Sequence, residues 1–169
     1  LEGSCFEHFC KTSLGSDPAK HQLLLEIIGY TLCNTVKGKS LFLLIGERDC
    51  GKSVVINLLA EMLPPDKITN FTLGQCGDNR NTQQLCNACA NLSGENEEDS
   101  IKSIHILKAC TGGDRISAGR RYKDNIMVKP CVHFVFALNR MPDNQSADTS
   151  DAFYRRMRPL VFPYSIPFE

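Results

Sequence analysis

The stretch from Ser40 to Met62, SLFLLIGERDCGKSVVINLLAEM, decides the fold. It opens with an apolar run that Gly46 stops, which is typical of a buried strand in a parallel sheet. From Lys52 onward its apolar residues recur at helical spacing, until Pro64 and Pro65 end the pattern. A strand, a glycine-containing loop and a helix in this order predict the first unit of an α/β sheet.

The loop of this unit, Gly46 to Ser53, matches the phosphate-binding pattern G-x-x-x-x-G-K-[ST]. In such a loop the glycines let backbone N–H groups surround phosphates, and the following helix adds a favourable dipole. We expect Lys52 to reach the β- and γ-phosphates of ATP and Ser53 to ligate Mg²⁺. The predicted nucleotide contacts are Gly46, Glu47, Arg48, Asp49, Cys50, Gly51, Lys52, Ser53 and Val54.

Composition narrows the class of protein. With 169 residues, 42% of them apolar, the chain has room for one domain with a hydrophobic core. It has no apolar run long enough to cross a membrane and no secretory leader, so we expect an intracellular protein of the cytoplasm or nucleus. Its nine cysteines lack the spacing of a disulfide framework and predict reduced thiols. Cys86 and Cys89 have no second pair that would favour zinc.

Patterns elsewhere in the chain predict further strands and helices. The expected helices cover residues 18–31, after Asp17 as N-cap, and 101–110; the expected strands cover 91–94 and 131–138; residues 115–117 and 126–128 are expected to pair as a hairpin. Residues 3–17 contain glycines and serines and are interpreted as a linker-like stretch. Strands alternating with helices predict an α/β sandwich with a mainly parallel sheet.

Polar residues after two of these strands are candidates for catalysis. Phosphoryl transfer depends on positioning and on charge stabilisation, so an acidic residue is expected where a strand next to the loop ends. Glu95 and Glu97 fit that position, with Glu95 as a second Mg²⁺ ligand, although both could instead cap the following helix. Asn139 ends the apolar strand and could orient the attacking water, or it could simply start a turn.

Two basic clusters suggest contacts with other molecules. Lysines and arginines equal aspartates and glutamates in number, so any contact with nucleic acid needs a local cluster. The hairpin turn supplies one, Arg120, Arg121, Tyr122 and Lys123, in which cations and an aromatic ring suit single-stranded DNA. Arg155 and Arg156 could stabilise transition-state charge at a neighbouring subunit's γ-phosphate. A solvated hairpin tip and a solvated basic edge are the alternatives.

The order of several short motifs is more specific than the phosphate loop alone. They are Ile28-Gly29-Tyr30, the loop itself, Ser93-Gly94-Glu95-Asn96-Glu97-Glu98, Leu107-Lys108, Thr111-Gly112-Gly113-Asp114-Arg115-Ile116, Arg121-Tyr122-Lys123, Asn139-Arg140-Met141-Pro142 and Arg155-Arg156-Met157. With these segments the chain resembles the superfamily 3 helicases, most closely the type fused to primases in poxviruses, other large DNA viruses, phages and plasmids.

The resemblance implies a P-loop NTPase with an AAA+-like three-layer sandwich, a mainly parallel sheet and a β-hairpin insertion. It implies a DNA helicase motor of replication that hydrolyses ATP at the interfaces of a homo-hexamer and encircles single-stranded DNA. On this mapping Glu95 is the Walker B acid with Glu97 as helper, and Asn139 is the sensor. Arg156, or else Arg155, is the arginine finger. Lys123 is the DNA-tracking residue of the hairpin.

The family resemblance also sets the expected domain boundaries. Residues 1–36 form a helical lead-in and residues 37–169 form the motor, within a longer polypeptide that carries a primase domain. Family loops commonly read G-x-G-x-N-G-K-S, whereas this chain has Arg48 and Cys50 at the third and fifth positions. These differences leave open a catalytically weak ring that binds DNA. A P-loop kinase of small molecules is the third alternative, against which residues 111–114 argue.

Overall fold

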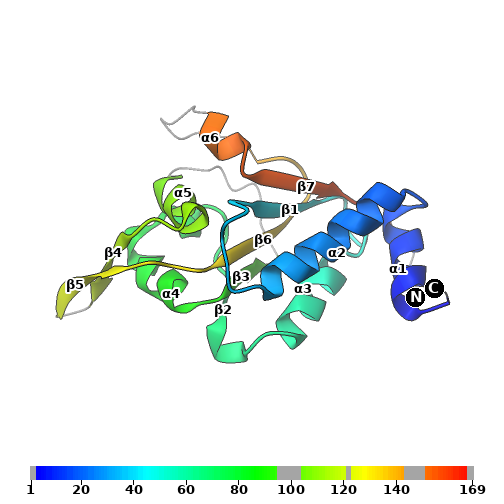
Figure 1. Ribbon diagram of the computed structural model, residues 1–169. Helices are drawn as coiled ribbons and strands as arrows, with labels where there is room; N and C mark the ends of the chain where they lie inside the picture. The colour runs from blue at the N-terminus through cyan, green and yellow to red at the C-terminus, as the bar shows by residue number, and fades with distance from the viewer. Residues whose placement is uncertain (1–2, 95–103, 121–122, 143–150, 167–169) are drawn as a thin grey trace.

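The computed structural model describes residues 3–94, 104–120, 123–142 and 151–166 (Figure 1). Its helices are α1 (Cys5–Leu14), α2 (Pro18–Leu32), α3 (Lys52–Glu61), α4 (Thr82–Asn87), α5 (His105–Gly112) and α6 (Asp151–Tyr154). Its strands are β1 (Leu41–Ile45), β2 (Ile68–Thr69), β3 (Ala90–Ser93), β4 (Ile116–Arg120), β5 (Lys123–Val128), β6 (His133–Leu138) and β7 (Met157–Val161). Short 3₁₀ turns are η1 (Pro65–Lys67), η2 (Gln75–Gly77) and η3 (Asn79–Asn81). None of the helices in these ranges is long and apolar enough to span a membrane.

Five strands form one parallel sheet in the order β2-β3-β6-β1-β7. Strand β1 lies between β6 and β7, so that Ile45 is opposite both Leu138 and Val161. Strands β4 and β5 form a separate antiparallel hairpin in which Ile116 is opposite Val128. The predicted α/β class, with a parallel sheet and an added hairpin, is confirmed.

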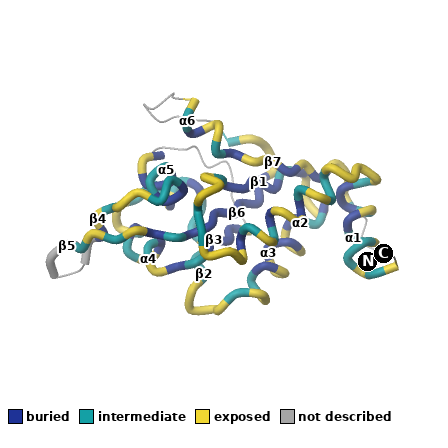
Figure 2. The backbone as a smooth tube through the Cα atoms, viewed as in Figure 1, coloured by how far each residue is buried: buried dark blue, intermediate teal, exposed yellow. Residues whose placement is uncertain are grey.

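Two hydrophobic cores cover the two faces of the sheet, because successive side chains of a strand point to opposite faces. Phe42 and Leu44 of β1 belong to the core that contains residues of α1, α2 and α3. Leu41 and Leu43 belong to the core that contains residues of α4 and α5. The molecule therefore has three layers, and the tube in Figure 2 is buried along the central strands. This double burial explains why β1 reads as a continuous apolar run.

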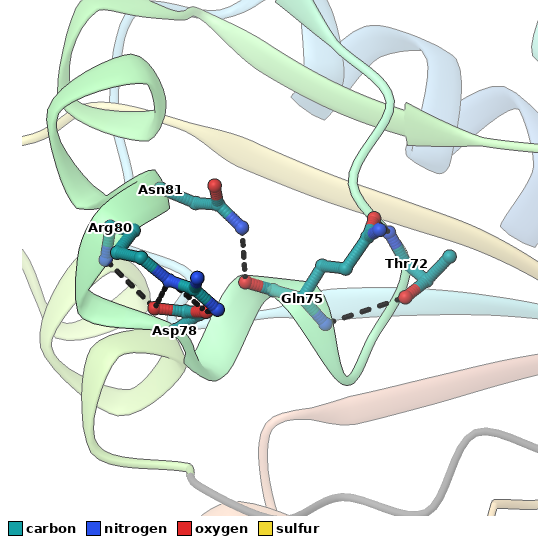
Figure 3. A network of polar contacts seen from close by, with 5 residues as sticks. All are labelled: Thr72, Gln75, Asp78, Arg80 and Asn81. Carbon is teal, nitrogen blue, oxygen red and sulfur yellow. Dashed lines mark hydrogen bonds and ion pairs between the residues drawn. The ribbon is translucent and has the colours of Figure 1, made fainter.

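The segment between β2 and α4 is shaped by polar side chains instead of strand pairing (Figure 3). Gln75 accepts from the backbone N–H of Thr72, and Asn81 donates to the carbonyl of Gln75. The Arg80 guanidinium donates to the carboxylate of Asp78 and lowers the pKa of that carboxyl. These groups are largely exposed, so we infer that they define the path of the loop more than they stabilise the fold.

The interpretation of residues 3–17 as linker-like is wrong, because residues 5–14 form helix α1. The Ser4 side chain caps the helix by accepting from the N–H of Glu7, and Gly15, with φ of 78°, ends it. The helix buries Cys10 and Leu14 against the sheet. Cysteine and serine on the buried face made its apolar pattern weak in the sequence.

Other element boundaries differ from the predicted ones by a few residues. The helix expected over residues 101–110 is α5, which begins at His105 and continues to Gly112; residues 101–103 lie outside the described residues. The strand expected from Cys131 begins at His133, and the hairpin strands are longer than predicted. Strands β2 and β7 and helix α4 were not predicted. Each of these elements is short or contains proline or polar residues, so its pattern in the sequence is weak. The two strands are defined by their pairing with β1 and β3.

A neutral histidine is built into the central strand. His133 is 2% exposed, its Nε2 donates to the carbonyl of Cys33, and its ring packs edge-on against Tyr30. Its Nδ1 is buried with no hydrogen-bond partner among the described residues. Burial lowers the pKa of His133 below its ordinary value of 6.5, which the Cys33 carbonyl only partly opposes.

This histidine makes stability depend on pH. Below about pH 6.5 the unfolded chain binds a proton at residue 133 that the folded chain resists, so the free energy of unfolding falls as pH falls. We expect wild-type stability to drop more than that of a His133→Gln variant between about pH 7 and pH 5, at about 1.4 kcal/mol per unit of pKa depression. Urea denaturation at a series of pH values measures this. Parallel pH profiles of the two proteins would contradict it.

Candidate nucleotide-binding site

The predicted phosphate loop lies at the carboxyl edge of the sheet, between strand β1 and helix α3. The N–H of Gly46 donates to the carbonyl of Leu138 over 3.1 Å, and the N–H of Phe162 donates to the carbonyl of Ile45 over 2.7 Å. The loop therefore starts between the carboxyl ends of β6 and β7. In open α/β sheets ligands bind beyond these strand ends.

Both glycines of the loop occupy positions where a side chain would not fit. A Cβ on Gly46 would lie 2.7 Å from the Phe162 carbonyl oxygen and 2.8 Å from the Cys50 Sγ. Gly51 has φ of 99°, and a Cβ there would lie 2.7 Å from the Ser13 Oγ. The first glycine thus permits close packing beneath the loop, and the second permits a left-handed turn into α3.

The lysine of the motif is folded back into its own loop. The Nζ of Lys52 donates to the carbonyls of Gly46 and Glu47 over 2.6 Å each and contacts the Cys50 Sγ at 3.4 Å. Lys52 is 9% exposed, so its charge is largely removed from water. It lies at the positive end of the α3 dipole, and the two together favour an anion such as a phosphate group.

A cavity of about 280 Å³ opens over the loop and the first turn of α3. It is lined by Asp49, Cys50, Gly51, Lys52, Ser53, Val54 and Ile166. Ser53 is exposed in the first turn of α3, where its hydroxyl could ligate Mg²⁺ held with a nucleotide. The loop, the buried ammonium and this hydroxyl fit the phosphates of a nucleotide with its metal ion.

The polar residues predicted beside the loop are placed only in part by the structure. Asn139 is exposed directly after β6, whose last residue, Leu138, lies opposite Ile45. Asn139 and Gly46 therefore begin neighbouring loops at the same edge of the sheet. Glu95 and Glu97 lie outside the described residues. The preceding strand, β3, ends at this same edge.

The predicted arginines lie at the amino ends of the strands, opposite the carboxyl ends where the phosphate loop lies. The N–H of Leu41, at the start of β1, donates to the carbonyl of Arg156 over 2.8 Å. Arg156 also donates to the Ala152 carbonyl, and its Nε is buried with no partner among the described residues. A pocket of about 560 Å³ surrounds these groups and is lined by Gly38, Lys39, Asp151, Ala152, Arg155, Arg156 and Arg158. The length of the paired strands β1 and β7 separates this basic pocket from the loop of the same chain.

Two of the four predicted DNA-contacting residues lie at the ends of the hairpin strands. Arg120 ends β4 opposite Lys123, which begins β5, whereas Arg121 and Tyr122 lie outside the described residues. The hairpin projects from the side of the molecule opposite α1 (Figure 1). The structure therefore separates the hairpin from the phosphate loop.

Several groups around the loop were not predicted. Phe9 and Ser13 of α1 lie against Gly51, and Ser165 donates to the carbonyl of Arg48. The N–H of Ile166 donates to the carbonyl of Asp49. These residues lie far from the loop in sequence and form no motif, so folding alone brings them to it.

The tight fit of Gly51 can be tested by adding one methyl group. We expect Gly51→Ala to lower the free energy of unfolding by about 1–3 kcal/mol, because the left-handed φ and the contacts with Ser13 and Phe9 both oppose a Cβ. Gly29→Ala is the matched control. Gly29 lies in α2 with open space around it, so alanine there should stabilise by about 0.5–1 kcal/mol. Equal urea midpoints for the two variants would contradict the placement of α1 against the loop.

Comparisons with known proteins agree with this fold. The chain is 26% identical over 155 residues to the "Putative helicase L207/L206" of Acanthamoeba polyphaga mimivirus, covering 86% of the chain but only 16% of that protein. Two structures of the C-terminal region of NrS-1 superpose with TM-scores of 0.65 and 0.67, at 15% and 17% identity, over 95% and 94% of the chain. The chain covers 37% of each of them.

A family profile spans most of the chain. Residues 44–156, from the end of β1 to the last residue before β7, match the family of unknown function DUF5906. The match includes the phosphate loop, Asn139 and both predicted arginines. The chain therefore belongs to the DUF5906 family.

Proposed function

We propose that the chain is the ATP-hydrolysing motor of a ring-forming DNA helicase that acts in replication and moves on single-stranded DNA. It is a helicase-like domain, distantly similar to the mimivirus "Putative helicase L207/L206". The chain covers 16% of that protein, so the proposal includes a longer polypeptide, with a primase domain, around it.

One observation carries the proposal: the phosphate loop lies at the carboxyl edge of the parallel sheet with Lys52 buried in it. The Lys52 ammonium group donates to two loop carbonyls. When a nucleotide binds, it would donate to phosphate oxygens instead. Asn139 begins the adjacent loop and would orient the attacking water, with Glu95 and Glu97 supplying carboxylates after β3. Mg²⁺, held by Ser53 and Glu95, would neutralise charge on the phosphates.

The position of Arg156 supports an assembly in which subunits complete each other's sites. Because the basic pocket and the phosphate loop occupy opposite edges of the sheet, Arg156 would act on the nucleotide of a neighbouring copy. The same pattern repeated around a ring gives a heterologous, closed assembly, for which we propose a hexamer. Arg155 is the second candidate for this role, because it is exposed and its Nη2 lies 3.7 Å from the Asp151 Oδ2.

The hairpin is the proposed DNA contact. Arg120 and Lys123 occupy opposite backbone positions in the hairpin. Their charges would contact phosphates, and Tyr122 would stack on a base. The separation of the hairpin from the loop makes DNA binding and ATP hydrolysis separable by mutation.

A weakly hydrolysing ring that binds DNA is the second candidate function, favoured by the unusual loop. Cys50 is 1% exposed and contacts the Lys52 Nζ, where the related helicases have asparagine. A thiol is a weaker hydrogen-bond partner than an amide and would orient the lysine less well.

Hydrolysis of ATP by the purified chain, with and without single-stranded DNA, distinguishes these functions. We expect turnover that DNA stimulates, and a loss of about 100-fold or more in Lys52→Ala, because the lysine stabilises transferring phosphate. Lys67→Ala, which removes an exposed lysine beyond α3, is the matched control and should keep full turnover. Unchanged turnover in Lys52→Ala would refute the site, and DNA binding without turnover would favour the second candidate.

Mixing two inactive variants tests whether Arg156 acts between subunits. An interface needs Lys52 from one subunit and Arg156 from its neighbour, so an equal mixture of Lys52→Ala and Arg156→Ala should regain about a quarter of the wild-type rate. Each variant alone should remain inactive. Mixed assemblies, verified by mass spectrometry, that show no recovery would count against a role in trans.

A further inference from the structure

The C-terminal segment Pro163–Ile166, hereafter the strap, lies across the phosphate loop. The strap follows Phe162, whose N–H donates a hydrogen bond to the Ile45 carbonyl. Farther along, the Ser165 Oγ donates to the carbonyl of Arg48 over 3.1 Å, and the Ile166 N–H donates to the carbonyl of Asp49 over 2.7 Å. The strap thus donates hydrogen bonds to two successive loop carbonyls, those of Arg48 and Asp49.

These contacts hold a strained part of the loop. Asp49 has φ of 56°, in the left-handed region that costs a residue with a side chain about 1–3 kcal/mol in ordinary surroundings. The carbonyl of Asp49 is the group that Ile166 pairs. The strap therefore holds the loop at the residue that adopts this left-handed conformation.

The strap also supplies a wall of the cavity. The phosphate end of the cavity is set by Lys52, which in this motif reaches the β- and γ-phosphates. With Lys52 at the β- and γ-phosphates, the α-phosphate, ribose and base of a bound nucleotide would lie farther from Lys52. The aliphatic residues among those that line the cavity are Val54, which is 52% exposed, and Ile166.

We propose that Val54 and Ile166 form the subsite for the base of the nucleotide, and that this subsite accepts different bases. The proposal rests on the proposed nucleotide site. Among the described residues lining the cavity, the side chains that can form hydrogen bonds, Asp49, Cys50, Lys52 and Ser53, belong to the loop and the helix start that hold phosphates. Within the described part of the chain the base would therefore meet two aliphatic side chains, which bind any ring face by apolar contact and form no hydrogen bond with its edge.

Two substitutions at one position separate the roles of the strap. Ile166→Ala shortens the aliphatic wall and keeps the N–H that pairs with Asp49. Ile166→Pro removes that N–H and so releases the loop. Leu25→Ala, which shortens an exposed aliphatic side chain on α2, is the matched control.

Calorimetric titrations of the full chain with ATP, GTP and inorganic tripolyphosphate, each with Mg²⁺, test the proposal. We expect wild type to bind ATP and GTP within about threefold of each other, because the two aliphatic side chains of the subsite do not distinguish the bases. Ile166→Ala should weaken both nucleotides about fivefold, through lost apolar contact, and leave tripolyphosphate, which has no base, unchanged. Ile166→Pro should weaken all three ligands.

The outcomes separate failure of the subsite from failure of the nucleotide site. A wild-type chain that binds none of the three ligands overturns the proposed function and the subsite with it. ATP bound tenfold or more tightly than GTP overturns the tolerance of different bases. Equal weakening of ATP and tripolyphosphate by Ile166→Ala, or no weakening of either, overturns the base contact while the nucleotide site stands.

Discussion

The close approach of the chain to itself at Gly46 is the constraint on which the rest of the structure depends. Strand β1 is buried on both faces and lies between β6 and β7, so the chain has little free space where it leaves the sheet. The carbonyl of Phe162 and the Cys50 thiol occupy the volume that a side chain would need. Only glycine, which has no Cβ, lets the backbone turn out of the sheet at this position. The loop, the start of α3 and the burial of Lys52 all follow from that turn.

The loop is supported by segments from both ends of the chain. Helix α1 packs Ser13 and Phe9 against Gly51, and the strap binds the carbonyls of Arg48 and Asp49. The family profile begins at residue 44 and ends at residue 156, so it includes neither support. A phosphate loop needs its backbone N–H groups held in place, and in this chain the contacts from α1 and the strap come from outside the matched residues.

The geometry gives a family of unknown function a specific hypothesis. A phosphate loop at one edge of the sheet, a basic pocket at the other and a hairpin projecting from one side are the parts that a ring motor requires. In the proposed motor their separation would let each cation cluster contact a different polyanion: the bound nucleotide of a neighbour at one place and the DNA backbone at another. Fold similarity to the C-terminal region of NrS-1 agrees with this arrangement of elements and does not by itself assign the activity.

The sequence by itself determined the elements whose signals are local. The run from Ser40 to Met62 specified strand, loop and helix, because apolar periodicity and glycine placement act within a few residues. The Asp17 cap and Pro18 specified α2 in the same way, and its start agrees with the prediction. The hairpin was also predicted, although its length was not.

Only the tertiary structure decided what surrounds the loop. No local signal marks Ser13, Ser165 or Ile166, since their partners are distant in sequence and the contacts form when the sheet assembles. The order of the strands is likewise a property of packing: β1 pairs with two strands that follow it by about ninety residues or more. The predicted arginines had a recognisable motif, but their position at the opposite edge from the phosphate loop came from the parallel pairing of β1 with β7. Local patterns specify which residues can bind a phosphate, and long-range packing specifies which of them can bind the same one.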